Sequence, residues 1–280
     1  MAGPSAIEWT EATWNPVTGC DRVSAGCDRC YAMTLARRLK AMGNPRYQND
    51  GRPETSGPGF GVTLHPEALQ APLRWRRPRV IFVNSMSDLF HPQVPDDFIA
   101  SVFDVMAACE HHTFQVLTKR PKRMAALVHR ILPEPLRNVW LGTSIEADPL
   151  VWRADALRRT PAAVRFLSLE PLIGPVPSLG LDGIDWVITG GESGHGARPV
   201  DPAWVLQVRD RCQASGVAFF HKQWGGRTPK AGGRLVDGRT WDEMPTRTDT
   251  EPTPLITAPR PAAVGDPARQ AVKRISVPAG

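Results

Sequence analysis

The stretch VIFVNSMSD, residues 80–88, shows the rule by which the chain is built. Its first four residues are apolar and mostly β-branched, which is typical of a short strand buried on both faces, and polar residues follow where that strand ends. A helical pattern comes next, from about Pro95 to Cys109. The same order recurs at FQVLTKRP, residues 114–121, and at VWLGTSIE, residues 139–146. This repetition predicts parallel strands that alternate with helices.

Further strands are expected at residues 164–169, 186–189 and 218–220. With a first strand before Cys20, the count reaches about seven β/α units over about 240 residues, the size of a (β/α) barrel. We therefore expect an α/β fold, a full or partial (β/α) TIM-type barrel with parallel strands. A doubly wound open sheet would give the same local pattern and is the alternative. The polar residues follow the strands, at the end where barrels place their active sites, which favours an enzyme.

Composition limits the class of protein further. The 280 residues are 41% hydrophobic, enough for a substantial core, and no run of about 18 apolar residues could span a membrane. The first residues, MAGPSAIEWTEATW, have neither a charged leader nor an apolar segment of a secretory signal. Five cysteines, an odd number, do not suit a disulfide framework and fit reduced thiols. We expect a cytoplasmic protein.

Two regions are expected along the chain. Residues 1–245 carry the barrel pattern and the cysteine loop. Residues 246–280 hold six prolines, no aromatic residue and little apolar periodicity, which predicts a disordered tail or tether.

A group of thiols precedes the first helical pattern. The sequence WNPVTGCDRVSAGCDRCY, residues 14–31, brings Cys20, Cys27 and Cys30 within eleven residues. Three thiols can bind one soft metal centre and leave one coordination position open. A structural zinc site usually takes four protein ligands, whereas a cubane iron–sulfur cluster held by three thiolates keeps one iron free for another ligand. Iron–sulfur binding is favoured, with a zinc site completed by a distant His as the alternative.

The motif, followed at once by Tyr31 and Ala32, resembles the cluster loop of radical S-adenosylmethionine (radical SAM) enzymes. It resembles more closely a phage-associated family of uncharacterised proteins with a three-cysteine motif, over residues 6–245. Radical enzymes of this kind commonly use CxxxCxxC with an aromatic residue before the last cysteine. Here the first spacer is six residues long, Arg29 stands in the aromatic position, and the aromatic residue follows as Tyr31.

This resemblance implies a barrel whose cluster loop follows the first strand. It implies a [4Fe-4S] cluster on the three cysteines and S-adenosyl-L-methionine on the open iron, with release of a 5'-deoxyadenosyl radical that abstracts hydrogen from a substrate. A reductant protein would supply the electrons. In such chemistry the protein places and shields the reactants.

By position, the resemblance implies that cofactor contacts come from the polar ends of neighbouring strands. The residues expected there are Ser85, Ser87, Asp88, Thr143, Ser144, Glu146 and Glu170. Gly190, Gly191 and Glu192 look like the GGE motif that grips the methionine amino group, but they follow about the sixth strand instead of the second. The acids could instead cap helices or pair with arginines at the rim.

Candidate substrate contacts lie at the remaining strand ends. They are Lys119, Arg120, Glu192, His195, His221 and Lys222. The formal net charge of +6 and the basic cluster that begins at Lys119 are compatible with nucleic acid as a partner, although a charge run is more often a solvated surface. One alternative function is a non-catalytic, metal-stabilised protein that binds nucleic acid or docks a partner. Another is a barrel nuclease or hydrolase that uses the acids.

Overall fold

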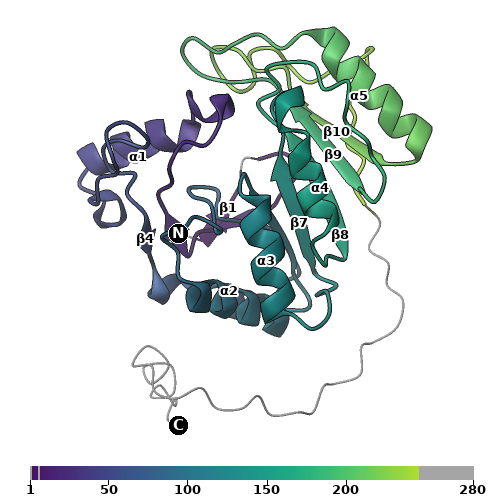
Figure 1. Ribbon diagram of the computed structural model, residues 1–280. Coiled ribbons are helices and arrows are strands. Elements are labelled where there is room, and N and C mark those ends of the chain that lie inside the picture. The colour runs from purple at the N-terminus through teal and green to yellow at the C-terminus, as the bar shows by residue number, and fades with distance from the viewer. Residues whose placement is uncertain (1, 6, 246–280) are drawn as a thin grey trace. The chain divides into compact units, whose positions relative to one another are not determined.

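The chain forms a curled sheet of mainly parallel strands with helices along its outer face (Figure 1). The computed structural model describes residues 2–5 and 7–245, so the tail expected at 246–280 lies outside the described residues. The strands are β1 (Ala2–Pro4), β2 (Ala12–Trp14), β3 (Val17–Thr18), β4 (Thr63–Leu64), β5 (Val80–Val83), β6 (Thr113–Thr118), β7 (Val139–Ser144), β8 (Val164–Leu169), β9 (Trp186–Gly190) and β10 (Ala218–Gln223). The α-helices are α1 (Tyr31–Ala41), α2 (Asp96–Ala108), α3 (Pro121–Ile131), α4 (Trp152–Arg158) and α5 (Pro202–Ser215). Single 3-10 turns are η1 (Ala25–Cys27), η2 (Pro45–Tyr47), η3 (Pro66–Ala68), η4 (Pro72–Arg74) and η5 (Asp148–Leu150).

The strand order decides between the two architectures that the sequence allowed. The main sheet runs β1-β2-β5-β6-β7-β8-β9-β10, and every neighbouring pair from β2 onward is parallel. A doubly wound sheet would reverse its strand order at a switch point, whereas this order follows the chain throughout. The fold is therefore a partial TIM-type barrel of seven parallel strands, with β1 added antiparallel at one edge. This confirms the expected fold class and the strand count.

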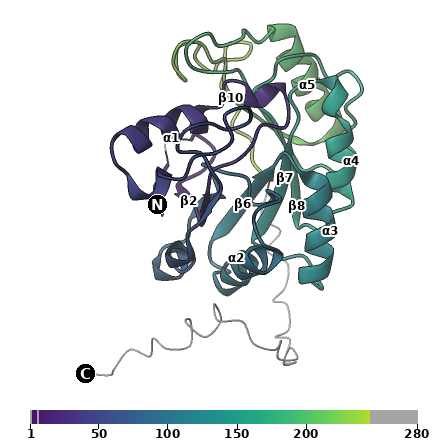
Figure 2. The ribbon, with the colours of Figure 1, turned by 60° about the vertical axis from the view of Figure 1, so that its left-hand side comes forward.

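Alternate residues of each strand pack on opposite faces, as the period of a strand requires. Outward residues such as Ile81, Val116 and Leu141 join one large apolar core, which also contains Phe103 of α2 and Leu127 of α3. Figure 2 shows α2, α3 and α4 along this outer side of the sheet. Burial on both faces explains why the strands are nearly continuous apolar runs.

The inner face carries a second, aromatic core. Trp186 of β9 is fully buried, and its ring lies 5.9 Å from Trp140 and 6.1 Å from Phe220, measured between centroids. Gly142 of β7 also points inward, and a Cβ added there would lie 2.5 Å from the Phe166 ring. Tightly packed aromatic rings thus fill the base of the half-barrel and leave its upper end, where the strands finish, to polar groups.

Two further expectations concern individual segments. Cys109 and Cys212 are both buried in the outer core, as predicted. Within the described part of the chain, no helix has the length and apolar character that crossing a membrane requires.

Candidate metal centre

The cysteine loop, defined as residues 19–30, directly follows β3 and runs across the carboxyl ends of the strands of the main sheet. Its first residue, Gly19, has a φ of +85°, and a Cβ there would lie 2.1 Å from the carbonyl oxygen of Gly61. The adjacent amide of Cys20 donates to the carbonyl of Phe60, at 3.2 Å. Only glycine allows the backbone to approach so closely. The segment of residues 44–63 therefore packs directly against the backbone of the first cysteine and supports its position.

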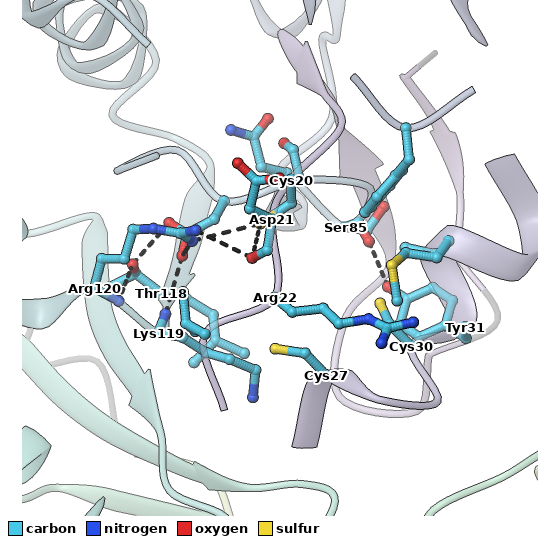
Figure 3. Close-up of a pocket in the computed structure, with 18 of the residues that line it drawn as sticks. Cys20, Asp21, Arg22, Cys27, Cys30, Tyr31, Ser85, Thr118, Lys119 and Arg120 are labelled. Carbon is cyan, nitrogen blue, oxygen red and sulfur yellow. Dashed lines mark hydrogen bonds and ion pairs between the residues drawn. The ribbon is translucent and has the colours of Figure 1, made fainter. Parts of the chain in front are cut away.

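The three cysteines reach one cavity of about 160 Å³ (Figure 3). Cys27 ends the turn η1, and Cys30 is the residue directly before α1. All three are free thiols. Apolar side chains of the cavity wall include Met33, Phe60, Phe82 and Leu117, and polar or charged residues such as Asp88 complete the lining. No group of three or more His, Cys, Asp or Glu side chains that could hold a metal ion occurs within residues 2–5 and 7–245.

The environment favours the protonated form of two of the thiols, Cys20 and Cys30. Burial raises the pKa of Cys20 to about 12, an effect to which nearby Asp88 adds and which Arg120 opposes. Burial also raises the pKa of Cys30, against the effect of the backbone N–H groups of Met33 and Ala32 at the start of α1. A metal bound by these sulfurs would therefore displace protons.

Arg120 links Cys20 to the ends of β5 and β6. Its guanidinium lies 3.4 Å from Cys20 Sγ, donates to Asp88 Oδ2 at 2.9 Å, and donates to the backbone carbonyl of Asp21 at 3.1 Å. Asp88 also accepts from the Thr118 hydroxyl at 2.7 Å and from the Lys119 amide at 3.1 Å. The Asp88 carboxylate is thus engaged in orienting Arg120, which places a positive charge beside a cysteine sulfur.

Glu146 anchors the cysteine loop from the end of β7. Its carboxylate accepts from the Ser24 hydroxyl at 2.8 Å and from Arg153 at 3.0 Å, and it pairs with Lys119. Burial alone would raise the pKa of Glu146, but Lys119 and Arg153 hold it below its usual value. Gly26 of the loop packs so closely on this side chain that a Cβ would lie 2.4 Å from it. Both carboxylate oxygens are occupied by partners within the chain.

Glu192, in the GGE sequence after β9, also binds the cysteine loop. It pairs with Arg198 at 2.5 Å and with Arg29 at 3.4 Å, and Arg198 donates to the carbonyl of Ala25 at 2.9 Å. Although burial acts in the opposite direction, these Arg198 hydrogen bonds keep the pKa of Glu192 below its usual value. The glycine-rich segment of residues 190–198 is therefore held by an ion pair within the segment and by contacts with the cysteine loop.

The expected site residues divide into two groups. Eight of them line the cavity: Cys20, Cys27, Cys30, Ser85, Ser87, Asp88, Lys119 and Arg120. The others do not line it: Thr143, Ser144, Glu146, Glu170, Glu192, His195, His221 and Lys222. Among the second group, Lys222 and Glu170 pair with each other at 2.5 Å, and His195 is exposed.

His221 and Thr143 face away from the mouth of the half-barrel. His221 is fully buried, its Nδ1 lies 2.9 Å from the Thr189 hydroxyl, and its ring packs on Trp224. Burial lowers its pKa to about 4, with a further contribution from Arg234. Thr143 donates its hydroxyl to the carbonyl of Thr118. The strand ends were correctly located by the sequence, but alternate residues there point outward, and these two contact the outer layer.

Several residues that shape the site had no expected role in it. Ser24, Arg29 and Arg198 hold the cysteine loop, and Arg22 lines the cavity. Asn84, directly after β5, has a φ of +62°, a conformation that asparagine tolerates, and its side chain accepts from the amide of Val17 at 3.3 Å. The Asn84 position could have been suspected, because asparagine after a strand is a common turn residue. The loop partners depend on contacts across more than a hundred residues and leave no local signal.

The fold and the cavity together define the class: a half-barrel of parallel strands with a cysteine-lined site at their carboxyl ends. The chain belongs to the family described as protein of unknown function, DUF5131, whose model matches residues 4–245. The family match leaves the expected phage association a prediction. No curated protein matches the chain.

Solved structures with similarity to the chain include forms of spore photoproduct lyase. A cysteine-to-serine variant of that enzyme is 13% identical, with a TM-score of 0.44, over 69% of this chain and 58% of that chain. The enzyme complexed with dinucleoside spore photoproduct is 12% identical, with a TM-score of 0.43, over 75% of this chain and 63% of that chain. The match thus spans less than two thirds of the length of the lyase chain in both structures.

Proposed function

We propose that the protein is an iron–sulfur enzyme of the radical SAM type, in which Cys20, Cys27 and Cys30 hold a [4Fe-4S] cluster and S-adenosylmethionine binds the iron that has no protein ligand. The observation that supports this most directly is that the three thiols line one cavity at the carboxyl ends of parallel strands. Barrel enzymes place their active sites at this end. Their substrates reach the site from the same side.

The donor set suits such a cluster. The thiols of a cubane cluster bond to different irons, so they need to surround a space and not to meet at one point. Cys20 comes from the start of the loop, whereas Cys27 and Cys30 come from its end, and all three border the same space. The Arg120 guanidinium beside Cys20 Sγ would offset the negative charge of a thiolate-bound cluster.

When bound, the cluster supplies one electron and an open coordination position to the sulfonium cofactor. The side chains of the protein would orient the cofactor and shield it from solvent. Phe60, Phe82 and Leu117 make an apolar wall that would limit contact between water and a cofactor bound against it. Ser85 and Ser87 reach the same cavity, with their hydroxyls directed to Asn15 Oδ1 and to the carbonyl of Val17. These two serines are the best-placed candidates for contact with the cofactor, and a reductant protein is the proposed source of electrons.

The test is anaerobic purification of the full chain followed by iron, sulfide and zinc analysis. We expect about four irons and four sulfides per chain, and 5'-deoxyadenosine after reduction in the presence of S-adenosylmethionine. Cys27→Ala should lose the iron, whereas Cys109→Ala, which alters a buried thiol of the outer core, should retain it.

Zinc in place of iron would contradict the proposal and favour the non-catalytic, metal-stabilised alternative. Full iron content in Cys27→Ala would contradict the assignment of the ligands. Iron without cofactor cleavage under any reducing condition would show a cluster-bearing binding protein.

A further inference from the structure

We propose that the substrate bound at this cavity is a single-stranded nucleic acid, with Arg22 and Arg52 holding its phosphates and Tyr31 stacking on a base. The inference deepens the proposed function by naming its substrate class, and it rests on that function only for the chemistry that follows binding. Three features of the described residues support it: which cations are free, how two cavities adjoin, and where an aromatic ring is exposed.

Within the residues that the structure describes, the cavity cations without an ion-pair partner are not the ones that the sequence indicated. Lys119 and Arg120 line the cavity, but each is paired with an acid of the chain, Glu146 and Asp88 respectively. Arg22 lines the same cavity and is exposed, and within the described part of the chain its guanidinium makes no hydrogen bond or ion pair. In Figure 3 its side chain extends past Cys27 toward Cys30 and Tyr31. An anion that enters the cavity would meet Arg22 without first breaking an ion pair.

A second cavity, also of about 160 Å³, adjoins the first, because Asp21 and Phe60 line both. Arg52 lines this second cavity, is exposed, and has no ion-pair partner among residues 2–5 and 7–245. The cysteine loop, which carries Arg22, contacts the segment of residues 44–63, which carries Arg52. The amide of Arg22 donates to the carbonyl of Thr55 in that segment, at 3.0 Å. Two guanidiniums that have no ion-pair partner in the described part of the chain, over adjoining cavities, suit a ligand with more than one phosphate along its backbone.

Tyr31 supplies a planar surface beside Arg22. It is 53% exposed although it begins α1 and lines the cavity, and its hydroxyl is held by the carbonyl of Ser85. An aromatic ring fixed at one end and open to solvent is the platform on which unpaired bases stack. The mainly apolar wall behind it accepts a flat, weakly polar group. An acidic peptide would use the arginines but has no comparable use for the ring and the apolar wall.

The test is fluorescence anisotropy of the full chain with labelled dT and rU 12-mers, over a range of salt concentrations, in metal-free and iron-loaded protein. Arg22→Ala and Arg52→Ala should each weaken binding about tenfold and lower the salt slope by about 0.7, the value for one phosphate of a single strand. Tyr31→Ala should weaken binding about tenfold, and Tyr31→Phe should stay within about twofold, because the ring remains.

Arg37→Ala is the matched control, since Arg37 is an exposed arginine of α1 that does not line either cavity. Its effect should be below about twofold, and circular dichroism should confirm that every variant is folded. Equal losses for Arg22→Ala and Arg37→Ala would overturn the proposal, as would failure to bind either oligomer. Tight, Arg22-dependent binding of a polyglutamate peptide with no effect of Tyr31→Ala would also overturn it, in favour of an acidic protein partner. Binding of the oligomers by a protein that never acquires iron would instead contradict the proposed function and leave this inference standing.

Discussion

The two sides of the barrel mouth are built differently. On the side of β2, β5 and β6, a cavity with an apolar wall holds three thiols, the Asp88–Arg120 ion pair and the guanidinium of Arg22, which has no ion-pair partner within residues 2–5 and 7–245. On the side of β7 to β10, the charged groups are paired within the chain: Glu146 with Lys119 and Arg153, Glu170 with Lys222, and Glu192 with Arg198 and Arg29. The cysteine loop crosses from the first side to the second.

This difference suggests separate roles for the two sides. The side of β7 to β10, here called the paired side, stabilises the cysteine loop, and the side of β2, β5 and β6, here called the open side, is available to bind ligands. A group that already has internal partners must lose them before it can contact a ligand, which is costly when the group is buried. The paired side therefore fixes the cysteine loop over the strand ends, and the open side offers the groups that can meet cofactor and substrate. The distinction can be tested by substitutions on the paired side, which should change stability and loop position before they change ligand contacts.

The largest effect is expected for Glu146→Gln. The substitution removes the negative charge between Lys119 and Arg153, and Arg153, only 2% exposed, would be left buried without its partner. Removal of one member of a buried ion pair typically costs 3–5 kcal/mol, so we expect the free energy of unfolding to fall by about 4 kcal/mol. Urea denaturation followed by circular dichroism measures it.

Glu54→Gln is the control, because Glu54 is exposed and lies in the loop segment of residues 44–63. It should change the free energy of unfolding by less than about 0.5 kcal/mol. Equal stability of Glu146→Gln and the wild type would mean that the paired side does not brace the mouth.

A second effect is expected on acidification. His221, fully buried on the outer face of the paired side, has its pKa lowered to about 4 by burial, from an ordinary value of 6.5. The unfolded chain binds this proton below pH 6.5 while the folded chain does not, so the free energy of unfolding should fall as the pH decreases from 6.5 toward 4. The full contribution of this residue is about 3 kcal/mol, present above pH 6.5 and lost at pH 4.

Comparison with His221→Phe isolates this contribution from the other buried histidines. The pKa values of His65, His91 and His112 are also lowered by burial, and they shift stability in the same direction. The variant keeps an aromatic ring against Trp224 but has no proton to bind. Its unfolding free energy should therefore depend less steeply on pH over this window, and an unchanged slope would contradict the assignment.

The fold was predictable because its information is local and repeated. Each strand has an apolar run, each run ends in polar residues, and the order of such units along the chain is also their order in the sheet. The grouping of the three cysteines at one cavity was predictable for the same reason, because all three lie within eleven residues of sequence. The sequence could not show that the sheet remains a partial barrel, since closure depends on whether the first and last strands meet.

The site roles were less predictable, because a residue type does not reveal its partners. Lys119 and Arg120 were expected to meet a ligand, yet Glu146 and Asp88 engage them. Glu192 was compared with a ligand-gripping motif, yet it binds Arg198 and Arg29. The roles of these residues as ligand contacts stay predictions. Long-range pairing also explains why Arg22 had no assigned role: among the cations of the cavity it differs from Lys119 and Arg120 in having no ion-pair partner within the described residues, which its sequence position does not reveal.

The smallest effect on stability, and a local effect on the cavity, is expected for Ser24→Ala. The change removes one hydrogen bond from the loop to Glu146, whose charge remains balanced by Lys119 and Arg153, so the free energy of unfolding should fall by only about 1 kcal/mol. The turn η1 that ends at Cys27 follows Ser24 directly, and a loosened turn should expose the Cys27 thiol. We therefore expect alkylation of Cys27 in metal-free protein, followed by mass spectrometry, to become several-fold faster. Thr34→Ala, which removes an exposed hydroxyl on α1, should leave that rate unchanged. Equal rates in both variants would mean that the paired side does not hold the cysteine loop in place.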